Sequence, residues 1–136
     1  MKTLIVYYSY SGHTKKIAEA LAESEAAGIA EIRSKKRPIK LKAYTAGIIS
    51  AIRGKAWPIQ PFDLDLAEYE RFILLSPVWA GNPPPPVYAM LEQLPPGKVV
   101  SIKMVSASGE SSCKERLETV IKEKNGSLES FEDIKS

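Results

Sequence analysis

Residues 3–14 read Thr3-Leu-Ile-Val-Tyr-Tyr-Ser-Tyr-Ser-Gly-His-Thr14, and this stretch already indicates the fold class. The run 3–8 is β-branched and aromatic without polar alternation, which predicts a strand buried on both faces, as in a parallel sheet. A polar loop containing a glycine follows at 9–14. Apolar residues then recur at helical spacing over 17–26, so the loop leads into an amphipathic helix that ends near Gly28.

The same succession of strand, loop and helix recurs along the chain. Two further buried strands are predicted at Phe72–Leu75 and Val99–Ser106, and shorter strands at Ile29–Ile32 and Ser127–Ile134. Helices are predicted at 43–53, Val87–Leu94 and Cys113–Lys124. Because parallel strands need crossover helices, the pattern predicts an α/β protein with a doubly wound parallel sheet of about five strands, in one domain over residues 1–136.

Composition excludes several classes of protein. The 136 residues are 44% hydrophobic and 26% charged, which is ordinary for a globular domain and too apolar for a disordered chain. No apolar run approaches the roughly 20 residues that a membrane helix needs, so no membrane association is expected. The single cysteine, Cys113, and the single histidine, His13, exclude an internal disulfide and a cysteine or multi-histidine metal cluster. These features predict a cytoplasmic protein without a bound metal.

Three polar loops follow predicted strands, at Ser9–Thr14, Pro77–Pro83 and Ser106–Ser112. Ligands of open parallel sheets bind beyond the carboxyl ends of the strands, so these loops form the candidate site. The first loop enters a helix, whose start offers unpaired backbone N–H groups and the positive end of a dipole. Its three hydroxyls and its glycine suit a phosphate group. The alternative is an ordinary helix cap by Ser11.

The second loop places a large aromatic residue, Trp79, beside Gly81 at the end of a strand. A planar ligand could lie against the tryptophan ring. Gly81 allows a positive φ, and Asn82 brings a hydrogen-bond donor and an acceptor. The alternative is that Trp79 packs in the core.

Together these motifs resemble those of the flavodoxin-like FMN-binding family, and in particular its short bacterial members. The resemblance rests on Leu4–Thr14, which is similar to the hydroxyl-rich phosphate loop of the family, on Ser76-Pro-Val-Trp-Ala-Gly81 with the prolines that follow, and on Ala51-Ile-Arg-Gly-Lys55. It covers almost the whole chain. It implies a five-stranded sheet in the order 2-1-3-4-5 and a non-covalently bound FMN.

The resemblance also implies a set of FMN-binding residues. The first loop would hold the phosphate through Ser9, Tyr10 (by its backbone), Ser11, Gly12, His13 and Thr14. The second loop would flank the isoalloxazine ring with Pro77, Val78, Trp79, Ala80, Gly81 and Asn82. The third loop would touch the pyrimidine edge of the ring with Ser106, Ala107, Ser108 and Gly109. In the family, a carbonyl of the second loop, here that of Ala80 or Gly81, can turn to accept a hydrogen bond from the reduced ring.

Three features depart from the family pattern. The third loop has no aromatic residue, which leaves the second ring face open or covered by Tyr44 or Trp57. The chain has a net charge of +3, whereas electron-carrying flavodoxins are commonly acidic. The chain also stops at Ser136, where the fold would normally add a closing helix. We expect that the final helix is missing by truncation; the alternative is a partner subunit, as in a homodimer, over the exposed sheet face.

The positive charge is concentrated in residues 31–55, which hold eight basic residues and one acidic residue. Apart from Tyr44, this segment lacks the interleaved aromatic residues of a surface that stacks on bases, so nucleic acid is not an expected partner. Its place after the second strand separates it from the phosphate loop. We interpret it as a surface that faces a partner or attracts an anionic cofactor.

Three functions are consistent with these features. An FMN-binding electron carrier fits the compact chain and would exchange electrons with a redox partner protein. An NAD(P)H-dependent FMN oxidoreductase of the quinone reductase type, with NAD(P)H and a quinone as reactants, is consistent with the absence of an aromatic residue in the third loop. It is also consistent with a basic surface that could attract an anionic cofactor. The third is a flavin-free interaction module. The sequence favours FMN-dependent redox function, assigns no catalytic residue and does not decide whether the protein is an enzyme.

Overall fold

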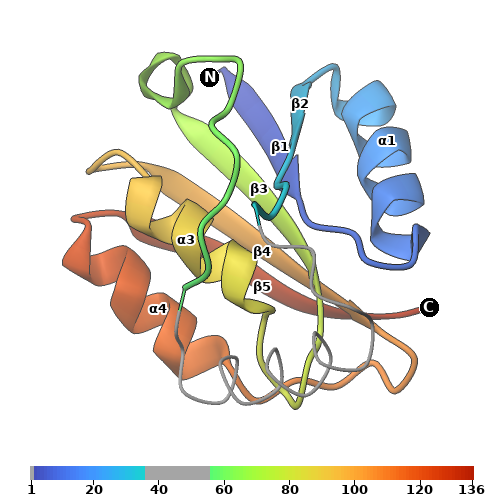
Figure 1. Cartoon of the computed structure of the whole chain (residues 1–136). Helices are drawn as coiled ribbons and strands as arrows, with labels where there is room; N and C mark the ends of the chain where they lie inside the picture. Colours follow the sequence, from blue (N-terminus) through green and yellow to red (C-terminus); the bar gives the residue numbers. More distant parts are fainter. Residues whose placement is uncertain (1, 36–55) are drawn as a thin grey trace.

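The computed structural model describes residues 2–35 and 56–136. Its centre is a sheet of five parallel strands in the order β2-β1-β3-β4-β5 (Figure 1). The strands are β1 Thr3–Tyr7, β2 Gly28–Glu31, β3 Arg71–Pro77, β4 Val99–Ser106 and β5 Ser127–Lys135. The predicted fold class, α/β with a flavodoxin-like sheet order 2-1-3-4-5, is confirmed.

Helices cover both faces of the sheet. Helix α1 (His13–Glu25) packs on one face, against β1, β2 and β3, whereas α3 (Pro85–Gln93) and α4 (Lys114–Glu123) lie on the other face (Figure 1). A short 3-10 turn, η1 (Leu66–Glu68), precedes β3. Strand and helix alternate as the sequence predicts, so the three site loops leave the sheet at the same edge.

Part of the basic segment lies outside the described residues, which stop at Lys35 and resume at Ala56. The helix predicted at 43–53 and Tyr44, one of two residues considered as a cover for the ring, fall in that gap. Trp57 is described, and its backbone N–H donates to the carbonyl oxygen of Pro85 at 3.3 Å. Among the helices that the structure describes, none has the length and apolar character to cross a membrane.

Alternate residues of the central strands build two apolar clusters, one on each face. Leu4 and Phe72 are register partners on β1 and β3, and both are fully buried against the side of α3 and α4. Their neighbours Ile5 and Ile73 are also partners and pack on the side of α1. Burial of both faces explains why these strands are continuous apolar runs in the sequence.

The boundary between α1 and β2 differs slightly from the sequence prediction. Helix α1 ends at Glu25 because Ala26 takes a left-handed conformation with φ 51°. Gly28 therefore opens β2 as the register partner of Leu4, instead of closing the helix. A Cβ atom at Gly28 would lie 3.2 Å from the hydroxyl oxygen of Tyr69, so the glycine permits a close approach of this tyrosine to the strand.

The sheet face that carries α1 becomes polar toward β4 and β5. Ser101 and Lys103 on β4 are register partners of Ile73 and Leu75, which pack on the side of α1, so all four share that face. Lys103 Nζ donates to Glu132 Oε2 on β5 at 2.7 Å. Charged side chains therefore pair with one another across this half of the sheet.

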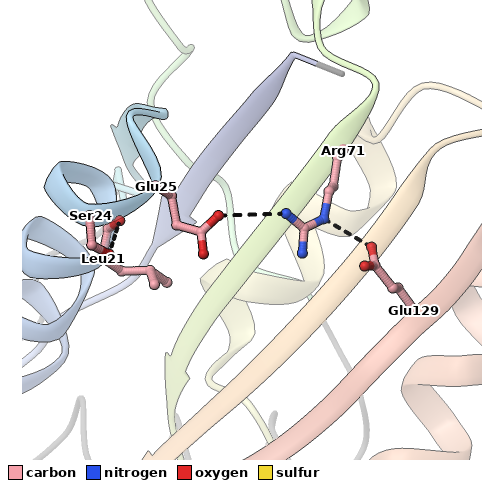
Figure 2. A network of polar contacts seen from close by, with 5 residues as sticks. All are labelled: Leu21, Ser24, Glu25, Arg71 and Glu129. Atoms are coloured by element: carbon pink, nitrogen blue, oxygen red, sulfur yellow. Dashed lines mark hydrogen bonds and ion pairs between the residues drawn. The ribbon is translucent and has the colours of Figure 1, made fainter.

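A second ionic network on the same face joins three elements. Arg71 Nε on β3 donates to Glu129 Oε2 on β5 at 2.9 Å, and Arg71 Nη1 lies 3.9 Å from Glu25 Oε2 at the end of α1 (Figure 2). The Arg71 side chain is only 25% exposed, so water screens these pairs less than it screens a fully exposed pair. The network attaches the last turn of α1 to the sheet.

Ser101 on this face provides the first testable prediction. Its hydroxyl is buried and has no hydrogen-bond partner among the described residues. Replacing Ser101 with alanine removes that unpaired group, so we expect the free energy of unfolding to rise by about 1 kcal/mol, measured by urea denaturation. Ser130, the exposed register partner of Ser101, is the matched control, and Ser130→Ala should change stability by less than about 0.5 kcal/mol. A loss of stability in Ser101→Ala would contradict the prediction.

Candidate functional site

The structure brings the three predicted site loops together at the carboxyl edge of β1, β3 and β4. The rings of Tyr10 in the first loop and Trp79 in the second are 5.6 Å apart between centroids. The second and third loops are joined by Ser112, whose backbone N–H donates to Gly81 O at 2.8 Å. The loops therefore form one continuous surface, as the topology predicts.

The first loop is organised by Ser9. Its Oγ accepts hydrogen bonds from the backbone N–H groups of Gly12 (3.0 Å) and Lys15 (3.3 Å). Gly12, with φ 97°, is the residue that precedes the helix, and no side chain caps from that position. The alternative interpretation, a helix cap by Ser11, is therefore wrong, because the cap is supplied from further back in the loop.

Two backbone donors remain at the start of α1. The N–H groups of His13 and Thr14 have no acceptor among residues 2–35 and 56–136. Ser11 and His13 are exposed, while Thr14 is 3% exposed. Unpaired amides at the positive end of a helix, next to hydroxyl groups, suit an anion such as a phosphate.

The second loop closes on itself between Trp79 and Asn82. The N–H of Trp79 donates to Asn82 O at 2.7 Å, and the N–H of Asn82 donates to Trp79 O at 3.1 Å. The two residues between them have positive φ values, 52° for Ala80 and 82° for Gly81. A non-glycine residue in this conformation costs about 1–2 kcal/mol, so neighbouring contacts must hold Ala80 there.

The carbonyl oxygens of the two central residues of this turn, Ala80 and Gly81, already accept hydrogen bonds. Asn82 Nδ2 donates to Ala80 O at 3.0 Å, and the backbone N–H of Ser112 donates to Gly81 O. By contrast, the N–H groups of Ala80 and Gly81 have no acceptor in the part of the chain that the structure describes. In this structure the turn therefore presents donors, not acceptors, to a ligand.

Trp79 packs in the core and does not form an open platform. Its residue is 9% exposed, and its ring meets the edges or faces of Tyr8 (6.3 Å, 77°) and Tyr10 (5.6 Å, 86°). The more exposed ring is that of Tyr10, at 52%. The family resemblance implies only a backbone role for Tyr10. An aromatic residue flanked by two serines in a polar loop was the sequence feature that could have indicated a role for its side chain in the site.

The third loop folds onto its own backbone. Ser106 Oγ accepts from the N–H of Gly109 at 3.0 Å, and Ser108 Oγ accepts from the N–H of Glu110 at 3.2 Å. Gly109 has φ 72°, and Ala107 and Ser108 are exposed at the tip. The loop is thus a small polar surface without an aromatic side chain.

Arg116 and Tyr88 extend the site beyond the predicted residues. Arg116 Nη1 donates to Asn82 Oδ1 at 3.0 Å and to Tyr88 OH at 3.3 Å. Burial raises the pKa of the Tyr88 phenol above its usual value, and the neighbouring Arg116 guanidinium partly offsets that rise. No local motif marks Arg116, because Asn82 lies 34 positions away in the sequence.

Cys113 is not a candidate for nucleophilic chemistry. It is 1% exposed, and burial raises the pKa of its thiol. This matches the interpretation of Cys113 as a small buried residue, and a helix-start thiolate is not favoured. Within the described ranges, no group of three histidine, cysteine, aspartate or glutamate residues could hold a metal ion.

A cavity of about 470 Å³ lies elsewhere, between β2 and residues 60–64. Its lining includes the ion pair between Arg33 Nε and Glu31 Oε1, at 2.7 Å, and none of the predicted site residues. The candidate site is therefore the surface made by the three loops, and the cavity is separate from it.

Comparison with known proteins gives matches among solved structures. No family model and no curated protein matches the chain. A flavoprotein in complex with FMN from Lactobacillus acidophilus is 25% identical over 96% of this chain and 91% of that chain, with a TM-score of 0.74. The apo-form of the flavoprotein from that organism has a TM-score of 0.73 at 25% identity, covering 97% and 92% of the two chains. Oxidised flavodoxin 1 from Bacillus cereus shares the fold, with a TM-score of 0.55 at 13% identity over 100% of this chain and 86% of that chain.

Proposed function

We propose that this flavodoxin-like protein binds FMN non-covalently at the three-loop surface and transfers electrons through it. The observation that carries the proposal is the pair of helix-start amides, of His13 and Thr14, which have no acceptor among the described residues and lie on the same surface as the exposed ring of Tyr10. A phosphate and a planar ring are the two parts of FMN that these groups suit. The likeness to a flavoprotein that was solved with FMN supports the proposal.

Each loop has a separate role in binding. Ser9 shapes the first loop, so that the N–H groups of His13 and Thr14 and the Ser11 hydroxyl are left for the phosphate. The second loop, 77–82, offers the ring the backbone N–H groups of Ala80 and Gly81, and the third loop, 106–109, offers a polar edge. Bound FMN would supply a ring system that accepts and releases electrons, while the protein sets how easily it does so.

A second candidate function is NAD(P)H-dependent reduction of a quinone through the same FMN. The observation that favours it is the third loop, where Ala107 and Ser108 are exposed and no aromatic side chain of the loop stands over the adjoining surface. A ring whose second face is open would admit a nicotinamide. Steady-state oxidation of NAD(P)H with a quinone separates the two functions, because an electron carrier alone would show no turnover.

The proposed function is tested by adding FMN to the purified protein and following the visible flavin absorbance of the protein fraction after gel filtration. Riboflavin, which has the ring but no phosphate, is the matched ligand. We expect FMN to bind at least about 100-fold more tightly, because charge-assisted hydrogen bonds to the phosphate are lost with riboflavin. Absence of flavin from the protein fraction would exclude both redox functions and leave the interaction module. Equal binding of the two flavins would contradict the phosphate site.

Substitutions in the phosphate loop should weaken FMN binding. Thr14→Val or Ser11→Ala removes a hydroxyl from the start of α1, so we expect the binding free energy to fall by about 1–3 kcal/mol, the usual effect of an unmet polar partner. Isothermal titration measures the change. Ser24→Ala, at the far end of the same helix, is the control and should bind FMN as the wild type does. Unchanged affinity in both loop variants would contradict this assignment.

A further inference from the structure

The conformation of the second loop depends on a hydrogen bond from a residue of α4, far from the loop in the sequence. The turn Trp79–Asn82 keeps Ala80 at φ 52°, a conformation that an alanine adopts only under constraint. Its constraint comes in part from Asn82 Nδ2, which donates to Ala80 O at 3.0 Å. Asn82 is 8% exposed, so this amide has little access to water as a substitute partner.

The other end of the Asn82 amide is engaged by a cation. Arg116 Nη1, in the first turn of α4, donates to Asn82 Oδ1 at 3.0 Å. A charged donor on the amide oxygen fixes which way the amide group faces and makes its NH₂ group a stronger donor. The same Nη1 atom also donates to Tyr88 OH in α3, at 3.3 Å, which limits the freedom of the guanidinium.

The direction of the Ala80 carbonyl determines what the turn offers to a ligand. Ala80 O accepts a hydrogen bond from Asn82, and Gly81 O accepts one from Ser112. The turn therefore leaves the N–H groups of Ala80 and Gly81 available to a ligand. Oxidised flavin carries hydrogen-bond acceptors along its ring edge, so a turn in this conformation matches it. If the peptide group between Ala80 and Gly81 rotated, the turn would present the carbonyl oxygen of Ala80 where it now presents the N–H of Gly81.

We propose that Arg116 is a positioning residue for the flavin ring, acting through Asn82 to hold the turn Trp79–Asn82 in the conformation that presents backbone donors. This inference rests on the proposed function for the ligand, while the holding of the turn is a property of the protein without FMN.

The first test uses the protein without FMN. Hydrogen exchange by NMR measures how often the N–H groups of Trp79 and Asn82, which close the turn, open to solvent. Arg116→Met keeps the length of the side chain but removes its donors, and we expect it to speed exchange of both amides about tenfold. Arg116→Lys retains a charged donor and should restore most of the protection. Unchanged exchange in Arg116→Met would overturn the proposal.

The second test adds FMN to the same variants. We expect Arg116→Met to raise the dissociation constant of oxidised FMN about tenfold, with recovery in Arg116→Lys. Lys114→Met is the control, because it removes a positive charge from the same helix turn, and among the described residues no hydrogen bond or ion pair joins Lys114 to the second loop. It should bind FMN as the wild type does. An equal weakening in Lys114→Met would mean that net charge alone acts, and this would overturn the positioning role.

The two proposals fail in different ways. If the wild type binds no FMN, the proposed function fails, and the exchange experiment still decides whether Arg116 holds the turn. If the wild type binds FMN and Arg116→Met accelerates exchange without weakening binding, the turn is held but not for the ring, and the positioning role is overturned.

Discussion

Trp79→Ala is expected to lower the free energy of unfolding by about 3–5 kcal/mol, the usual loss when a large buried aromatic residue is truncated. Trp79 is 9% exposed and packs against two tyrosine rings, those of Tyr8 and Tyr10, so its removal leaves a cavity below the site. Urea denaturation followed by far-ultraviolet circular dichroism measures the loss without using the fluorescence of the replaced residue. We also expect an altered flavin spectrum in this variant, because the ring site loses its support.

Tyr10→Ala is the matched comparison for Trp79→Ala. Tyr10 is 52% exposed, so its removal should lower stability by no more than about 1 kcal/mol. It should nevertheless change the spectrum of bound FMN, because Tyr10 carries the exposed ring of the surface. A loss of stability in Trp79→Ala as small as in Tyr10→Ala would place the tryptophan outside the core.

Gly81→Ala is expected to lower the free energy of unfolding by about 2–4 kcal/mol, from strain at positive φ together with overpacking. Gly81 has φ 82°, and a Cβ atom there would collide with Ser112 Oγ. Ser112 Oγ must move to relieve this collision, and Ser112 belongs to the third loop, which is joined to Gly81 by the Ser112 backbone N–H. Binding of FMN should therefore weaken as well, as measured by titration at a temperature where the variant remains folded.

Two companion variants separate strain from collision. Gly12 has φ 97°, but a Cβ atom at this position would meet no described residue within 4 Å, so Gly12→Ala should lose only the strain contribution of about 1–2 kcal/mol. In the double variant Gly81→Ala with Ser112→Ala, the colliding oxygen is gone, and part of the lost stability should return. If Gly12→Ala and Gly81→Ala were equally stable, the steric explanation would be wrong.

The fold was predictable because its strongest determinant is local. Unbroken apolar runs such as Phe72–Leu75 indicate strands with two buried faces. The helical spacing of apolar residues over 17–26 indicates the helix that follows the first strand. The boundary at Gly28 was not fixed by the local sequence, because a glycine can end a helix or admit a close neighbour equally well. The tyrosine that needs this space, Tyr69, lies far along the chain.

The positions of the site loops were predictable, but the roles of individual side chains were not. Topology alone places the three loops at one edge of the sheet. Whether Trp79 faces a ligand or the core depends on the tyrosines around it, and both arrangements give the same local sequence. Ser9 and Ser11 are equally good cap residues by type, and the left-handed turn at Gly12 selects Ser9. Arg116 reaches Asn82 only after the whole of α3 and β4 is in place.

The ion-paired face of β4 and β5 has a consequence for self-association. An uncovered sheet face rich in leucine and valine would drive aggregation, since burial of apolar area is what holds such faces together. Here the pairs Lys103–Glu132 and Arg71–Glu129 place charged groups on that face, and the two glutamate side chains remain 56% and 45% exposed to water. Burying these charged groups in an interface would cost desolvation energy that new contacts must offset. Self-association through this face should therefore depend on ionic strength more than on temperature.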